Sequence, residues 1–193
     1  MSKIDDLIQQ YCPDGVEYRK VEDVCSIIKG EQLNKNNLLN EGKYPVMNGG
    51  ISPSGYWNEY NFDENSIIIS QGGASAGYTQ FMTSAFWAGA HCYVVKPHTI
   101  LNKYLYYFIK NNQNILMGNQ YGAGIPSLNK KTIEQLSIPI PPIPVQEEIV
   151  RILDAFTELE KELEKELEKR KQQYEYYRNK LLTFDENTTG GGY

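Results

Sequence analysis

Short hydrophobic groups alternate with glycine- and asparagine-rich segments over residues 1–140. The run SIIIS at 66–70 is too short and too rich in β-branched residues for a helix, and it is typical of a buried strand. Apolar and polar positions alternate in GYTQFM at 77–82, which predicts a strand, and HCYVV at 91–95 predicts another. The segment 133–140 also has an extended pattern. This part of the chain is therefore expected to contain several short strands.

Helical spacing occurs in only two places within the same region. Residues 4–11 form one short amphipathic pattern, and 100–116 form a longer one with apolar positions every three or four residues. Residues 16–28 predict a strand with one helical turn, and 118–129 predict a loop because they contain three glycines. Short strands mixed with a few helices predict an α+β fold, with one globular domain over 1–140.

A different pattern begins with IPIPPIPV at 138–145. Each proline disfavours helical geometry in the residue before it, so this segment predicts an extended, polyproline-like brace. Pro144 fits the first position of a helix, where its missing N–H costs nothing. Glu147 and Glu148 then complement the helix dipole. A helix over 145–183 would be about 58 Å long.

One face of this helix is a continuous apolar stripe. Between Phe156 and Leu167 the apolar steps are three, four and four residues, an eleven-residue repeat that predicts a nearly straight helix pair. The brace and helix are assigned to 141–184, and 185–193 are expected to be disordered. A long apolar stripe needs a partner helix, which predicts a homodimer; the alternative is a charged helix packed on its own domain. The expected dimer interface consists of Phe156, Leu159, Leu163, Leu167, Tyr174, Tyr177 and Leu181.

Charge is distributed unevenly along the chain. The formal net charge is −5, yet no acid lies between Glu64 and Glu134. Residues 146–193 carry twelve acids and eight bases. A local basic surface is what contact with nucleic-acid phosphates requires, and whole-chain charge hides it. The alternative is a polar domain whose acids lie elsewhere. The acid-free interval contains the five lysines Lys96, Lys103, Lys110, Lys130 and Lys131.

Several classes of protein are excluded by what the sequence does not contain. No run of eighteen apolar residues exists, and the N-terminus is acidic, so neither a membrane span nor a signal peptide is expected. The three cysteines Cys12, Cys25 and Cys92 have no CxxC spacing, which indicates reduced thiols in a cytoplasmic protein.

No catalytic or metal-binding set can be assembled from the remaining residues. His91 and His98 belong to no metal-binding motif, and His91 fits the end of a strand with its ring satisfied by the backbone. The segment GGASAG at 72–77 is glycine-rich but matches no nucleotide-binding motif. Its glycines expose backbone N–H groups to a phosphate, or they form a tight turn. We expect no catalytic residue, metal or cofactor in this chain.

DNA contact is the function that fits the polar and glycine-rich loops. Asn, Gln and Ser side chains can read base edges, Lys side chains bind phosphates, and aromatic rings contact thymine methyl groups. Most of the ten aromatic residues from Tyr78 to Tyr121 are expected in the core. The candidate DNA-binding residues are Asn48, Gln71, Gly72, Gly73, Ser75, Tyr78, Asn119, Gln120, Tyr121, Lys130 and Lys131.

The sequence resembles the DNA-specificity (S) subunits of type I restriction–modification systems. The resemblance extends from about residue 12 to 182, and the proline–Gln–helix segment is its most specific motif. Members usually contain two target-recognition domains, each followed by a conserved helix, whereas this chain has one of each and resembles a half-length form. The matching motifs are CPDGVEY near the start, GKYPVMNGG at 42–50, SIIISQGGASAGYTQF at 66–81, YLYYFI at 104–109 and IPIPPIPVQEEIVRILDAF at 138–156.

This resemblance implies a division of labour. Each recognition domain would read one half of a split DNA site, and paired antiparallel helices would hold two domains a fixed distance apart. Modification subunits, which bind S-adenosylmethionine, and ATP-driven restriction subunits would assemble on this scaffold, which performs no chemistry. Two other functions stay open. One is the recognition domain of a single-chain restriction–methyltransferase fusion, and the other is a coiled-coil adaptor that binds only protein.

Overall fold

The computed structural model describes residues 2–119 and 126–184. Contacts divide the chain into two units, Met1–Val150 and Arg151–Tyr193. The tail predicted to be disordered, 185–193, lies outside the described residues. In chain order the elements are α1 (Lys3–Tyr11), β1 (Glu17–Lys20), α2 (Val21–Val24), β2 (Cys25–Lys29), η1 (Lys35–Asn37), β3 (Tyr44–Met47), β4 (Gly55–Trp57), β5 (Ser66–Ser70), β6 (Thr79–Met82), β7 (Trp87–Ala88), β8 (Cys92–Pro97), α3 (Asn102–Asn111), α4 (Gln113–Gly118), α5 (Lys130–Glu134), β9 (Ser137–Ile140) and α6 (Ile143–Leu182).

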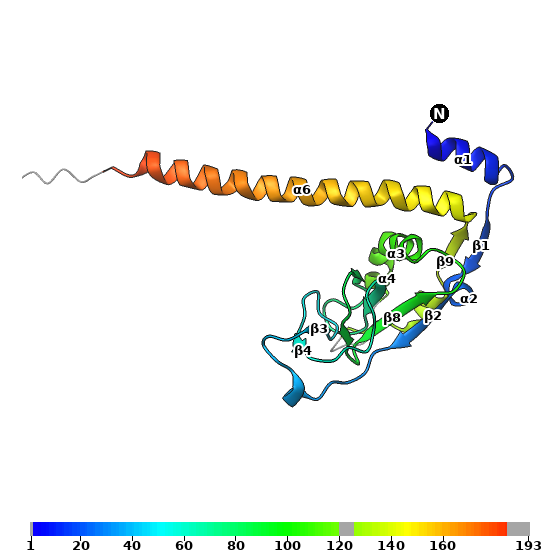
Figure 1. Cartoon of the computed structure of the whole chain (residues 1–193), viewed down its shortest axis with the longest axis horizontal. Helices are drawn as coiled ribbons and strands as arrows, with labels where there is room; N and C mark the ends of the chain where they lie inside the picture. Colours follow the sequence, from blue (N-terminus) through cyan, green and yellow to red (C-terminus); the bar gives the residue numbers. More distant parts are fainter. Residues whose placement is uncertain (1, 120–125, 185–193) are drawn as a thin grey trace, which may run out of the picture. The chain divides into compact units, whose positions relative to one another are not determined.

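The predicted α+β fold is confirmed. An antiparallel four-stranded sheet with the order β2-β8-β5-β6 forms the centre of the first unit. A smaller sheet, β4-β3-β7, contains the parallel pair β3–β7. β1 and β9 form a separate antiparallel pair. Within this unit, β1 and β9 lie at one end and β3 and β4 at the other (Figure 1).

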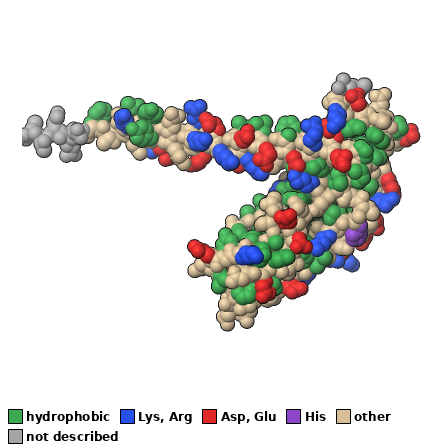
Figure 2. Space-filling model, viewed as in Figure 1, with side chains coloured by type: hydrophobic (Ala, Val, Ile, Leu, Met, Phe, Trp, Pro, Cys, Tyr) green, Lys and Arg blue, Asp and Glu red, His purple; other side chains and the backbone are tan. Residues whose placement is uncertain are grey.

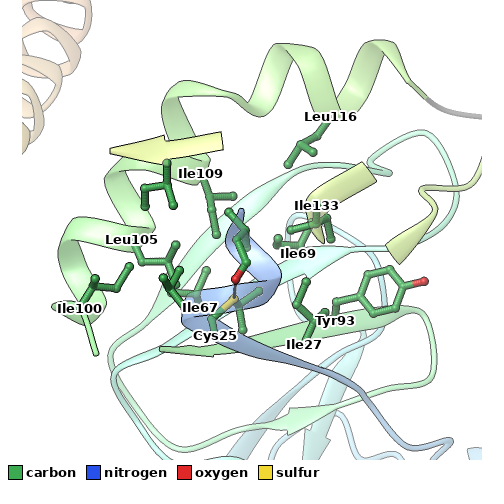
Figure 3. Packing of buried hydrophobic residues seen from close by; sticks show 14 of the residues in the cluster. Cys25, Ile27, Ile67, Ile69, Tyr93, Ile100, Leu105, Ile109, Leu116 and Ile133 are labelled. Carbon is green, nitrogen blue, oxygen red and sulfur yellow. Dashed lines mark hydrogen bonds between the residues drawn. The ribbon is translucent and has the colours of Figure 1, made fainter. Parts of the chain in front are cut away.

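Strand β5 contributes side chains to the hydrophobic clusters on both faces of the central sheet. All five of its residues are buried, and its side chains alternate between two hydrophobic clusters because strand side chains point to opposite faces. Ile67 and Ile69 belong to the larger cluster, whereas Ile68 belongs to the smaller one. Figure 3 shows the larger cluster, where Leu105 and Ile109 of α3 face Ile67 and its neighbours.

Two local expectations were wrong, and one helix boundary is shifted. The segment from residue 133 begins as the end of α5 because the Asn129 side chain accepts a hydrogen bond from the backbone N–H of Lys131 and caps that helix. The brace is not a polyproline rod, since Ser137–Ile140 pair with β1. Helix α6 begins at Ile143, two residues before its expected start.

The first turns of α6 are fixed to the first unit by two buried polar side chains. Gln146 is 1% exposed; its Nε2 donates to the Pro141 carbonyl at 2.8 Å, and its Oε1 accepts from the Leu101 N–H at 2.9 Å. Leu101 is the N-cap of α3, so this amide satisfies a donor that a helix start leaves open. Glu148, which is 3% exposed, forms an ion pair with Lys3 at 2.7 Å. The proline–Gln motif therefore joins three elements.

Replacing Gln146 with alanine is expected to destabilise the first unit by about 1–3 kcal/mol, because a buried N–H and a buried carbonyl would lose their partners. The melting temperature should fall by about 2–4 °C per kcal/mol in a protein of this size. Thermal unfolding followed by circular dichroism measures this. Glu147→Ala is the matched control, since Glu147 is the exposed neighbour in the same turn. Equal melting temperatures for both variants would contradict the role of Gln146.

Beyond Val150, α6 is a regular helix with a mixed surface. Acidic and basic side chains alternate along it, with hydrophobic side chains exposed between them (Figure 2). The ion pairs Lys161–Glu158 and Arg170–Glu166 have N–O distances of 2.7 and 2.9 Å. None of the helices in the described part of the chain is long and apolar enough to span a membrane.

Candidate nucleic-acid interface

Four turns converge at one end of the central sheet. They follow β2, β3 and β5 and precede β8, and they comprise residues 30–31, 48–50, 71–73 and 89–91, which we call the glycine edge. Backbone hydrogen bonds join the turns directly: Gly30 N–H to the Cys92 carbonyl at 2.9 Å, Gly89 N–H to Met47 at 2.7 Å, and Gln71 N–H to His91 at 2.8 Å. The edge is therefore one connected surface built from distant parts of the sequence.

The glycines of this edge are needed for close packing of the turns. A Cβ on Gly30 would overlap the carbonyl oxygen of Gly89, and a Cβ on Gly89 would overlap the Oδ1 atom of Asn48. Gly49 has a φ of +88°, which a residue with a side chain rarely adopts, and its Cβ would lie 3.1 Å from His91. Gly30, Gly49 and Gly89, together with Gly73, which has a φ of +78°, thus have a structural role whatever binds beside them.

The structure brings four of the candidate DNA-binding residues together on the glycine edge, namely Asn48, Gln71, Gly72 and Gly73. All four are half-buried. The Asn48 Oδ1 accepts from the His91 N–H at 3.4 Å. The Gln71 carbonyl accepts from the Leu128 N–H at 2.7 Å, and the Gly73 N–H donates to Pro126 at 2.9 Å. The strand-like segment 126–128 therefore borders the same edge.

Ser75 and Tyr78 lie in the turn that follows this edge. The Ser75 carbonyl accepts from the Tyr78 N–H at 2.8 Å. The Tyr78 ring has the Lys110 Nζ 4.4 Å from its centroid, and this ammonium also donates to the Thr79 carbonyl at 3.1 Å. Burial lowers the pKa of Lys110. Lys110 thus holds Tyr78 in place, and both residues are half-buried.

The remaining candidates lie elsewhere or outside the described residues. Asn119 is exposed after α4, and its Nδ2 donates to the Ile115 carbonyl at 2.7 Å. Gln120 and Tyr121 lie outside the described residues. Lys130 and Lys131 are exposed on α5, and Lys130 forms an ion pair with Glu134 at 3.1 Å.

The position of Lys130 separates it from the glycine edge. It lines an open pocket with Cys25, Ser26 and His98, at the beginning of β2 and after the end of β8. The glycine edge adjoins the opposite ends of the same strands, where Lys29 pairs with Tyr93. The two lysines predicted to bind phosphate therefore lie about one strand length from the polar turns.

The acid-free interval does not form one basic patch. Lys96 lies over the Phe62 ring and Lys103 over the Phe81 ring, with 5.2 and 5.9 Å to the ring centroids. The cations beside the glycine edge are instead Lys29, at the end of β2, and Lys35. Sequence reasoning missed both because they lie in a segment that also contains acids, including Glu31.

A cavity of about 230 Å³ adjoins the glycine edge. Its wall combines amide, hydroxyl and ammonium groups with aliphatic side chains, the residue types that contact base edges, phosphates and thymine methyl groups. The cavity is lined by Gln32, Leu33, Asn34, Lys35, Leu38, Val46, Asn48, Ser54 and Gly89.

The thiols and the side chains that can bind a metal ion are the remaining reactive groups. Among the described residues, no group of three or more His, Cys, Asp or Glu side chains could hold a metal ion. The cysteines are free and buried. Burial raises the pKa of Cys25 to about 12 and that of Cys92 to about 11, so both are protonated thiols at neutral pH.

Solved structures with the same fold identify the class of protein. The crystal structure of a type I restriction–modification system S subunit from M. genitalium is similar, with a TM-score of 0.71 and 26% identity. The similarity covers 90% of this chain and 48% of that one. The HsdS subunit from Thermoanaerobacter tengcongensis has a TM-score of 0.58 at 20% identity, over 81% of this chain and 42% of that one, which supports the fold.

Sequence comparison gives the family. Residues 13–169 match the type I restriction modification DNA specificity domain, and the chain belongs to this family. A putative type I restriction enzyme specificity subunit of Haemophilus influenzae is 36% identical over 186 residues, covering 89% of this chain and 47% of the relative. A putative type I specificity subunit of Mycoplasma pneumoniae is 30% identical over 181 residues, covering 87% and 58%. The chain thus spans about half the length of these relatives.

Proposed function

We propose that this chain is the DNA-specificity subunit of a type I restriction–modification complex and reads one half of a bipartite site. The observation that carries the proposal is the extent of the family match, which includes the α+β domain and more than half of α6. The polar surface of the glycine edge and its cavity support DNA contact. The exposed apolar stripe of α6 supports association with another helix.

The chemistry of the complex is proposed to reside in other subunits. Modification subunits would supply S-adenosylmethionine and the methyl transfer, and restriction subunits would supply ATP-driven cleavage. This chain would contribute sequence recognition and a scaffold, without a catalytic group or cofactor of its own. Its proposed location is the cytoplasm, where the DNA substrate of a restriction system is found.

Two copies of the chain would form the functional scaffold. Identical recognition domains related by a two-fold axis read identical half-sites, so the recognised sequence would be an inverted repeat around an unread spacer. Antiparallel α6 helices would place the two domains at opposite ends of the pair, whereas parallel helices would place both at one end.

The direct test is to sequence the methylated sites in cells that express this chain with its modification subunit. The expected result is methylation at one inverted-repeat sequence, absent when this chain is omitted. Binding to random-sequence duplex at low salt provides a second measurement. A protein-only adaptor would show no salt-dependent DNA affinity, whereas a DNA-binding subunit must.

Phosphate contacts are tested by removing lysines in pairs. We expect Lys29→Ala with Lys35→Ala to weaken binding to all duplexes alike and to reduce the slope of log affinity against log salt by about two. Lys130→Ala with Lys131→Ala should also reduce the slope, but by less than two, because Lys130 forms an ion pair with Glu134. An unchanged slope for both variants would contradict the proposed orientation of the domain on DNA.

A further inference from the structure

We infer that His91 is a base-reading residue of this domain and that its imidazole donates a hydrogen bond to the N7 atom of a purine in the major groove. This inference rests on the proposed DNA-recognition function. It assigns a contact that residue type and loop placement alone did not indicate. The sequence offered the end of a strand, with the ring satisfied by the backbone, only as the alternative to a metal ligand.

The backbone of His91 is fixed from two sides. Its N–H donates to the Asn48 Oδ1 at 3.4 Å, and its carbonyl accepts from the Gln71 N–H at 2.8 Å. These partners belong to the turns after β3 and β5, and Cys92, the next residue, begins β8. The backbone that carries the imidazole is therefore ordered before DNA binds, which reduces the entropy lost on binding.

The ring itself is available. His91 is exposed, and its ring forms no hydrogen bond with any described residue. The residues beside it are Gly49 and Gly72; a Cβ on Gly49 would lie 3.1 Å from the His91 Cβ, and one on Gly72 would lie 3.6 Å from Nδ1. Because Gly72 has no side chain, a DNA base can approach the imidazole on the flank of its Nδ1 atom.

The chemistry of the imidazole matches the major-groove pattern of purines. A neutral imidazole has one N–H donor and one acceptor, and a protonated ring has two donors. Guanine and adenine both present the N7 acceptor in the major groove, and guanine adds the O6 acceptor. Asn48, which was expected to read bases itself, becomes a positioning residue, because its Oδ1 already holds the His91 backbone.

The second histidine of the chain serves as a natural control. His98 is also exposed, but its Nε2 lies 2.8 Å from the Ser26 Oγ, and it follows the other end of β8. If histidine contributed only positive charge, replacing His91 or His98 would change DNA binding in the same way. If His91 reads a base, only the replacement of His91 changes the response to that base.

The experiment measures the DNA affinity of the full chain with its modification subunit. The duplexes carry the recognition site identified by methylation sequencing, with single purines replaced by 7-deazapurines. These analogues keep base pairing and remove only the N7 acceptor. The wild type should lose about two- to tenfold in affinity at one purine of each half-site, as expected for one hydrogen bond. His91→Ala should lose the same affinity on the natural duplex and show no further loss with the analogue at that position. His98→Ala should respond to the analogue as the wild type does. His91→Gln, which retains an N–H donor, should recover part of the affinity that His91→Ala loses on the natural duplex.

Each outcome decides the inference. If His91→Ala keeps the wild-type response to the analogues, or if the wild type responds to none of them, His91 does not donate to N7 and the inference is wrong, while the proposed function stands. If His98→Ala abolishes the response as well, the effect is not specific to the glycine edge and the inference is also wrong. If the wild type shows no sequence preference, the proposed function fails and this inference fails with it. Equal melting temperatures of the variants confirm that each is folded.

Discussion

Replacing Leu163 and Leu167 together with aspartate is expected to convert a dimer into a monomer. At 100° per residue, the seven stripe residues from Phe156 to Leu181 lie within about 40° of a single line along α6. Each of these side chains is 49–67% exposed in the single chain. An apolar line of this length in water is a strong indication of a partner helix, and a second copy carries the complementary surface.

The magnitude follows from the buried apolar area. Two substitutions in each copy remove four leucines from the interface, at about 1.5–3 kcal/mol each. The total of roughly 6–12 kcal/mol corresponds to a dissociation constant raised by more than about ten-thousandfold. Sedimentation velocity at micromolar concentration should show the change from dimer to monomer directly.

The matched control places aspartate on the opposite face of the same helix. Lys165 and Gln172 lie about 180–200° from Leu163 by helical geometry, and both are exposed. Lys165→Asp with Gln172→Asp should remain dimeric. A wild-type chain that already sediments as a monomer at this concentration would rule out the homodimer.

Lengthening α6 should separate the two half-sites of the DNA. Inserting one eleven-residue repeat after Leu167 keeps the apolar stripe in register, since the repeat turns the helix by only about 20° beyond three full turns. In an antiparallel pair it moves the domains apart by about 16 Å, or roughly five base pairs. Half a turn of DNA would then direct the two domains toward opposite sides of the duplex. Binding to the original site should fall to the non-specific level, about a thousandfold or more.

A two-repeat insertion distinguishes a spacing effect from damage to the helix. Two repeats add roughly ten base pairs of separation, close to one full turn of DNA. This variant should bind specifically to a site whose spacer is longer by that amount, and it should not bind specifically to the original site. Electrophoretic mobility shifts with spacers of graded length measure both variants. If the single-repeat variant binds the original spacer with unchanged affinity, α6 does not set the distance.

The sequence predicted the elements whose residues carry their own periodic pattern. Strand β5 was recognised from SIIIS because a short β-branched run is typical of a buried strand, and α3 from its spacing of apolar side chains. Strands β3, β4 and β7 were not predicted. They are two to four residues long, and β3 pairs with β7 across about forty residues of sequence, so their existence depends on partners rather than on a local pattern.

The candidate site could be predicted only in part from the sequence. Asn48 and Gln71 were chosen by residue type, and they do lie together on the glycine edge. The contact proposed for His91 was not predicted, because its neighbours Gly49 and Gly72 lie in turns that are distant in the sequence. Gln146 was read only as part of a helix start, since its hydrogen-bond partner Leu101 lies far away in the sequence. Contacts between turns that are distant in the sequence leave no periodic pattern, so the contacts of His91 and Gln146 could be found only in the structure.

The glycine edge and the anchored start of α6 lie at opposite ends of the first unit, with the central sheet between them. Gln146 forms hydrogen bonds with Leu101 and Pro141, and Glu148 forms an ion pair with Lys3; these three partners lie outside the turns at 48–50 and 71–73. A substitution in those turns leaves the residues that orient the helix untouched. If the glycine edge reads DNA as proposed, exchanging these short turns would change the sequence that is recognised and leave the start of α6 unchanged.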